Sequence, residues 1–145
     1  VAVYSLHLKS NGMSRDTKDP AKQATLNRLQ RELAAAQLVD HLADIAKQPD
    51  LAPQAAIVGG DFNTDPTQER FAEEQTVPIF TAAGFKSVHA GQPLALRTTI
   101  PAKGRSPDTT FDYLLLKNLT AKSPALIVPN EVSDHRPVTI TVEVP

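Results

Sequence analysis

Six polar side chains that could carry acid–base or metal chemistry lie in or directly after apolar runs of this sequence. They are His7, Asp61, Asn63, Asp112, Asp134 and His135. A carboxylate can serve as a general base toward water, an imidazole can stabilise developing charge, and an amide can orient a phosphate. Carboxylate oxygens are also ligands that hard divalent cations prefer. With no cysteine and no nucleophilic serine motif, the set favours attack of an activated water on a phosphorus centre.

Asp61 and Asn63 follow the apolar run Ala55–Val58 and two glycines. Residues two apart in an extended chain point the same way, with Phe62 opposite them. The carboxyl end of a buried strand is where α/β folds place their chemistry. The same Asp and Asn could instead bond the backbone of a strand-to-helix loop, and this segment alone does not decide between the two.

The remaining candidates have structural alternatives of the same kind. A single strand histidine such as His7 is more often a structural residue than a catalytic one. Asp112 interrupts the apolar strand FDYLLL and needs partners, because burying an unpaired charge is costly. The adjacent pair Asp134–His135 suits a carboxylate that orients an imidazole, but it could also be a plain turn. No dinucleotide-binding or P-loop signature is present.

A sheet is needed to bring these residues together, and the hydrophobic pattern predicts one. The predicted strands are 1–9, 55–60, 85–89, 109–117, 126–129 and 137–144. Between the first two lies a helix predicted over 21–48, with Asp19 as N-cap, Pro20 at its start, and Arg28, Arg31 and Glu32 on its polar face. Two shorter helices are predicted, one over 66–74 with Asp65 as its N-cap and one over 77–83, and 90–108 reads as a long irregular connection.

This order predicts an α/β (α+β) fold with one mixed sheet, helices on one face and nothing to cover the other. The 145 residues fit one domain, and 41% hydrophobic content excludes a disordered chain. No apolar run approaches the length of a transmembrane helix. The net charge of −1 gives no whole-chain attraction to nucleic acid, although basic residues near the start and in 75–107 hint at a basic rim. Because Val1 already lies in a strand, we expect a piece of a longer protein.

Four segments in this order, SLHLKS, GDFN, FDYLLL and SDHRPV, resemble the deoxyribonuclease I-like endonuclease/exonuclease/phosphatase superfamily. The resemblance implies a four-layer αββα sandwich made of two similar halves. Residues 1–145 then correspond to the C-terminal half of the domain, and the N-terminal half is missing from this chain. The uncovered sheet face would be the surface that meets the missing half.

The resemblance also implies roles for the matching residues. Asp61 would position or deprotonate the attacking water, and Asn63 would hold the phosphate. His7 would stabilise the pentavalent state or assist the leaving oxygen. His135 would contact the scissile phosphate, oriented by Asp112. The metal would be Mg²⁺, with Mn²⁺ as the alternative, and Asp134 would help to hold it. Further substrate contacts are expected from Lys103 and Arg105 in the basic loop. The family's early Asn and its metal-binding Glu have no match here.

We therefore expect a metal-dependent phosphoester hydrolase, with a phosphodiesterase or nuclease first and nucleic acid as the expected substrate. A phosphomonoesterase or sphingomyelinase-like hydrolase of the same superfamily is the enzyme alternative. A non-catalytic binding module is the alternative of a different class, and the isolated piece is expected to be inactive without the missing metal ligand. The expected partner is the N-terminal half. The resemblance reaches secreted and periplasmic bacterial members, and no residue pattern decides the location.

Overall fold

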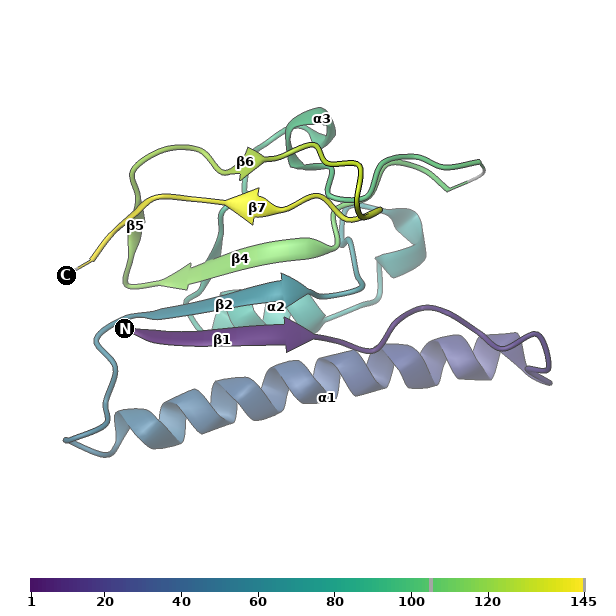
Figure 1. The fold of residues 1–145 in the computed structure, drawn as a ribbon. Helices are drawn as coiled ribbons and strands as arrows, with labels where there is room; N and C mark the ends of the chain where they lie inside the picture. The colour runs from purple at the N-terminus through teal and green to yellow at the C-terminus, as the bar shows by residue number, and fades with distance from the viewer. Residues whose placement is uncertain (105, 145) are drawn as a thin grey trace.

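A four-stranded mixed sheet forms the centre of the computed structural model, which describes residues 1–104 and 106–144 (Figure 1). Its strands are β1 (Ala2–His7), β2 (Ala56–Asp61), β4 (Asp112–Lys117) and β3 (Lys86–Ser87), in the order β1-β2-β4-β3. The pairing of β1 with β2 is parallel, whereas β4 runs antiparallel to both β2 and β3. The predicted mixed sheet is thus confirmed.

Two helices, α1 (Pro20–Ala46) and α2 (Thr76–Ala82), lie behind the sheet in Figure 1 and cover one of its faces. Asp19 caps α1 by accepting a hydrogen bond from the Lys22 amide at 3.0 Å, and Pro20 opens the helix, as predicted. The core between these layers includes Val58, Phe62, Phe80, Phe85 and Leu115. No helix in the described part of the chain combines the length and the apolar character needed to cross a bilayer.

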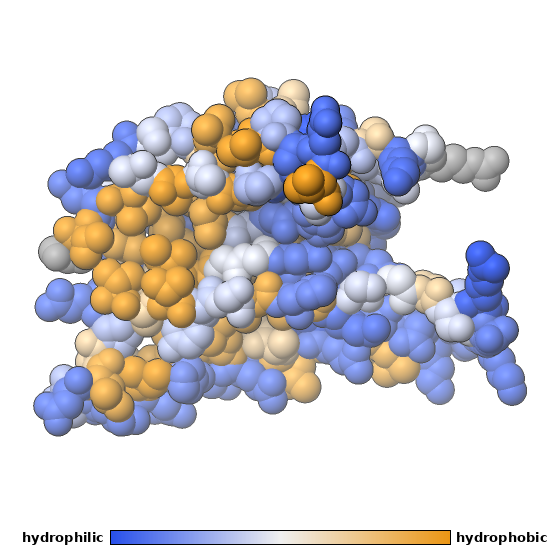
Figure 2. Space-filling view, in the orientation of Figure 1, coloured by the Kyte–Doolittle hydropathy of each residue, from blue (hydrophilic) through white to orange (hydrophobic). Residues whose placement is uncertain are grey.

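The opposite face of the sheet is open over β1. Strand alternation places Val3, Ile57 and Leu116 side by side on this face, where Val3 is 71% exposed but Leu116 on β4 is only 5% exposed. Figure 2 views the molecule from this side and shows apolar residues gathered on the left and hydrophilic residues on the right, where β1 and β2 end. The open face therefore divides into an apolar part and a polar part, and the polar part holds the candidate site.

The helix predicted over 66–74 is wrong, because only the single 3₁₀ turn η1 (Glu69–Phe71) forms there. Asp65, expected as its N-cap, is fully buried instead. Its carboxylate accepts hydrogen bonds from the Thr67 hydroxyl at 2.7 Å and the Thr110 amide at 3.1 Å, and it faces the Arg97 guanidinium at 3.4 Å. These tertiary bonds take the chain out of the helical path.

Arg31 was predicted on the polar face of α1, but its side chain is only 2% exposed. Its Nε and Nη2 both donate to Glu74 at 2.6 Å, and its Nη1 donates to the Lys9 carbonyl at 2.9 Å. Thr76 adds a hydrogen bond to Glu74 at 2.7 Å. A buried ion pair thus joins α1 to the segment after β1 and to the segment before α2.

The strand predicted over 137–144 is divided in two. Its first part, β7 (Val138–Thr139), pairs with β6 (Leu126–Ile127), and its second part, β8 (Val142–Glu143), pairs with β5 (Thr120–Ala121). The break arises because the two parts bond to different partners. The predicted irregular connection over 90–108 contains the short helix α3 (Leu94–Arg97).

Replacing Asp65 with asparagine is expected to lower the free energy of unfolding by about 3 kcal/mol at pH 7. Burial alone would raise the pKa of Asp65, but hydrogen bonds from Thr67 and Thr110 and the charge of Arg97 lower it overall. A carboxyl group whose pKa is lower in the folded state stabilises the fold at pH values above its unfolded-state pKa. This stabilisation is lost as the pH falls through the folded-state pKa. Urea unfolding at several pH values should show the difference shrinking below about pH 4. Asp16→Asn, at an exposed position, is the control; a pH-independent difference would contradict the charge argument.

Candidate active site

The sheet register places three of the predicted residues next to one another. His7 pairs with Asp61 across β1 and β2, and Asp61 pairs with Asp112 across β2 and β4. All three point to the open face, at the edge where β1 and β2 end. The His7 side chain is 78% exposed, whereas that of Asp61 is 18% exposed, and His7 Nε2 lies 3.8 Å from Asp61 Oδ2. A sheltered carboxylate is thus flanked by an open imidazole and a second carboxylate.

Asn63 holds the Asp61 carboxylate in place. Its backbone amide donates to Asp61 Oδ1 at 2.8 Å, and its side-chain Nδ2 donates to Asp61 Oδ2 at 2.9 Å and to the Leu8 carbonyl at 3.1 Å. Asn63 has a φ of 52°, in the left-handed region that is uncommon for residues other than glycine. Asp61 does accept a hydrogen bond from the local backbone, which was the structural alternative to a catalytic role. This bond fixes the Asp61 carboxylate in the site.

Asp112 orients His135. The imidazole Nδ1–H lies 2.9 Å from Asp112 Oδ2 and 3.1 Å from Oδ1, which leaves Nε2 for another partner. Thr99 fixes the backbone at Asp112, because its Oγ1 accepts hydrogen bonds from the amides of Phe111 and Asp112. His89 also binds the Asp112 carbonyl through Nε2 at 3.0 Å. The structure thus brings together the pair whose contact the resemblance implied.

Burial raises the pKa of Asp61 above its ordinary value, and the nearby Asp112 charge adds to this rise, while the amide of Asn63 opposes it. One ligand atom each from Asp61, Asp112 and His135 lies within 4.8 Å of the other two. Two carboxylates and an imidazole at this spacing form a donor set that a divalent cation can use, and the cation would relieve the repulsion between the carboxylates.

The sequence profile of the Endonuclease/Exonuclease/phosphatase family matches residues 4–135, which include every residue of this cluster. The chain belongs to the endonuclease/exonuclease/phosphatase family. A search of curated proteins found no significant match. Among solved structures, the chain is similar to the human Nocturnin catalytic domain with bound sulfate anion, at 22% sequence identity and a TM-score of 0.43. That match covers 77% of this chain and 41% of the Nocturnin chain, so the present chain spans about two fifths of that structure's length.

Three residues predicted for the site of this family member lie outside the cluster or outside the described residues. Asp134 is exposed and is not one of the three clustered ligands. Lys103 is also exposed, and both line a hollow of about 220 Å³ that reaches Arg136. Arg105, the other predicted substrate contact, lies outside the described residues. The cluster itself therefore consists of His7, Asp61, Asn63, Asp112 and His135.

Sequence reasoning missed the residues that support the cluster from behind. Thr99 is completely buried, and His89 is 4% exposed, with burial lowering its pKa. His89 ends the third predicted strand, and Thr99 lies in the irregular connection predicted over 90–108, which carries no periodic pattern. A single sequence offers no signal that these side chains bond the backbone at Asp112, because the three residues come together only in the tertiary structure.

Proposed function

We propose that this chain carries the water-activating residues of a metal-dependent phosphoester hydrolase that acts as a phosphodiesterase or nuclease. The observation that carries the proposal is the convergence of a sheltered Asp61, held by Asn63, with the Asp112–His135 pair on an open face. Membership of the endonuclease/exonuclease/phosphatase family supports the same class of reaction.

In this proposal Asp61 orients the attacking water and accepts its proton. His7, exposed beside Asp61, donates to an oxygen of the phosphorane or of the leaving group. His135 uses Nε2 to contact the scissile phosphate, since Nδ1–H is engaged by Asp112. Asn63 Nδ2 already bonds Asp61 and the Leu8 carbonyl. Its main role is therefore to orient Asp61, and holding phosphate through this amide requires one of the two bonds to be exchanged.

The carboxylates of Asp61 and Asp112 fit a divalent cation, for which Mg²⁺ is the proposal and Mn²⁺ the alternative, while His135 keeps Nδ1–H on Asp112 and Nε2 for the phosphate. When bound, such an ion would lower the pKa of a water and offset the charge that develops on the phosphoryl oxygens. The protein residues retain their own tasks: Asp61 handles the proton, and Asp112 keeps the imidazole in one tautomer.

The apolar part of the open sheet face is where we propose that the preceding half of the family's domain packs. Val3 is 71% exposed there, beside Ile57 on β2. A second layer over this part would cover apolar surface and leave the polar end as one wall of a cleft. Under this proposal the principal metal ligand comes from the other half, so the isolated chain has little turnover.

Removal of divalent cations is expected to abolish hydrolysis. The assay measures turnover of bis(p-nitrophenyl) phosphate, plasmid DNA and sphingomyelin with Mg²⁺, with Mn²⁺ and with EDTA, for this chain and for a protein that includes both halves. We expect DNA and bis(p-nitrophenyl) phosphate to be cleaved by the two-half protein, and Mg²⁺ to restore activity after chelation. Preference for sphingomyelin would favour the lipid alternative. No turnover of any substrate, or turnover unchanged by EDTA, would overturn the metal-dependent hydrolase.

A further inference from the structure

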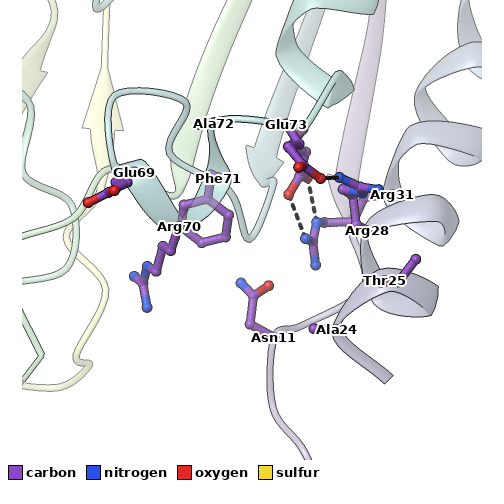
Figure 3. Close-up of a pocket in the computed structure, with 11 residues that line it drawn as sticks. Asn11, Ala24, Thr25, Arg28, Arg31, Glu69, Arg70, Phe71, Ala72 and Glu73 are labelled. Atoms are coloured by element: carbon purple, nitrogen blue, oxygen red, sulfur yellow. Dashed lines mark hydrogen bonds and ion pairs between the residues drawn. The ribbon is translucent and has the colours of Figure 1, made fainter. Parts of the chain in front are cut away.

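A hollow of about 420 Å³ lies between the amino-terminal half of α1 and η1, apart from the catalytic cluster (Figure 3). Its lining is polar and charged around one aromatic ring. The residues that matter here are Asn11, Arg28, Glu69, Arg70, Phe71 and Glu73. None of them belongs to the predicted catalytic or substrate-binding residues, so the proposed function assigns this hollow no role.

Arg70 is held in one orientation at the edge of this hollow. Its Nε donates to Gln68 Oε1 at 2.9 Å. Its guanidinium carbon lies 4.6 Å from the centre of the Phe71 ring and 5.8 Å from that of Phe111. Within residues 1–104 and 106–144 no carboxylate forms an ion pair with it and no acceptor bonds its terminal nitrogens. A guanidinium fixed through Nε, with both terminal nitrogens available, is prearranged to bind an anion.

Three arginines and three glutamates line the hollow, so the placement of these charges decides what an entering anion meets. Arg31 and Glu74 form a buried neutral pair. Arg28 pairs with Glu73, whose side chain is 85% exposed, and its Nε lies 4.0 Å from Glu32 Oε1, so two carboxylates offset its charge. Figure 3 shows the Glu69 carboxylate pointing away from Arg28 and Asn11, on the far side of Arg70. Among the described residues, Arg70 is therefore the cation that an entering anion would meet first, with the paired Arg28 beside it.

Two contacts connect this hollow to the proposed catalytic residues. Asn11 Nδ2 donates to the Asn63 carbonyl at 2.5 Å, so the lining of the hollow touches the residue that holds Asp61. Phe111, over which Arg70 lies, directly precedes Asp112 and accepts the Phe62 amide through its carbonyl at 2.8 Å. The hollow thus adjoins the segments that carry Asn63 and Asp112.

We infer that Arg70, with Arg28 and Asn11, binds a phosphate of a nucleic-acid strand other than the phosphate being cleaved. The inference rests on the proposed function and names its substrate class. A strand supplies phosphates in series, whereas a phospholipid such as sphingomyelin has one phosphate and would leave this hollow empty. Phosphate contacts position a strand without reading its sequence, so the hollow confers a preference for a polynucleotide and none for particular bases.

The test measures binding of a fluorescent single-stranded oligodeoxynucleotide by anisotropy, in EDTA so that no cleavage is required. Arg70→Met is expected to weaken binding about 10-fold and to reduce the slope of log K against log salt by about 0.7, the value for one phosphate contact on a single strand. Arg28→Met should weaken it less, because Glu73 already competes for that side chain. Lys86→Met, an exposed cation on β3 at the other end of β4, is the matched control and should leave affinity and slope nearly unchanged.

Inorganic phosphate and an oligonucleotide of a different base composition serve as comparison ligands. Two strands of different composition should lose affinity equally in Arg70→Met, and millimolar phosphate should compete poorly with the strand. Equal losses in Arg70→Met and Lys86→Met, no loss in Arg70→Met, or no binding by the unmodified chain would overturn the inference. Competition by phosphate as strong as that by a second strand would reduce the hollow to a simple anion site. Because binding is read without metal, failure of hydrolysis and failure of this subsite give separate results.

Discussion

Asp61→Asn is expected to lower the rate of phosphodiester hydrolysis about 10³-fold, within the range for loss of a general base. Asparagine preserves the size of the side chain and one acceptor oxygen for Asn63, but it cannot take a proton from water. The carboxylate it replaces is sheltered and held by two hydrogen bonds from Asn63, at 2.8 and 2.9 Å. The measurement is kcat and KM for bis(p-nitrophenyl) phosphate with the two-half protein, and we expect the loss in kcat.

The matched control is Asp50→Asn, an exposed carboxylate in the turn before β2, at the other end of the sheet. It should leave kcat within about 2-fold, as expected of a surface substitution away from the chemistry. A Mg²⁺ titration of Asp61→Asn separates loss of the base from loss of the metal, because excess Mg²⁺ restores only the latter. Retention of a tenth or more of the activity at saturating Mg²⁺ would remove Asp61 from its proposed role.

Arg31→Met is expected to lower the free energy of unfolding by about 3–5 kcal/mol, because it leaves the buried Glu74 carboxylate without a cation. Glu74 is bonded twice by Arg31 at 2.6 Å and once by Thr76 at 2.7 Å, and the Arg31 side chain is 2% exposed. The measurement is urea unfolding followed by circular dichroism. Arg31→Met combined with Glu74→Leu should recover much of the loss, since no unpaired charge remains.

Arg28→Met provides the control for this prediction. Arg28 lies three residues earlier on α1, and its partner Glu73 precedes Glu74, but the Glu73 side chain is 85% exposed. Loss of such a pair is expected to change the free energy of unfolding by less than about 1 kcal/mol. Equal effects of the two arginine substitutions, or a double variant no more stable than Arg31→Met, would show that burial of the charge is not the cause.

The parts of the fold that were predictable are those with local causes. The Asp19–Pro20 start of α1 is one, because the cap bonds an amide three residues away. The strands that carry Asp61 and Asp112 are others, because apolar runs and glycines are visible over a few residues. The convergence of the cluster followed from strand ends and from the family resemblance together.

The parts that were not predictable depend on distant partners. Asp65 fails as a helix cap because it bonds Arg97, 32 residues later, and Thr110, 45 residues later. Arg31 leaves the polar face of its helix because Glu74, 43 residues later, receives it in the core. Arg70 was assigned to a helix that does not form, so its stacking over Phe71 and Phe111 could not be anticipated. In each case the local pattern is compatible with an ordinary solvated residue.

The parallel pairing of β1 with β2 has a consequence for how the protein folds. A parallel pair needs a long crossover, and here α1 occupies it, so that Leu8 meets Asn63 across 55 residues of chain. Asp61 and Asp112 are likewise joined only by a long connection. Contacts between such distant residues form late and slowly, because the chain between them must first lose its freedom. The cluster is therefore a property of the fully assembled sheet, and no partly folded intermediate that lacks β1 or β4 contains it.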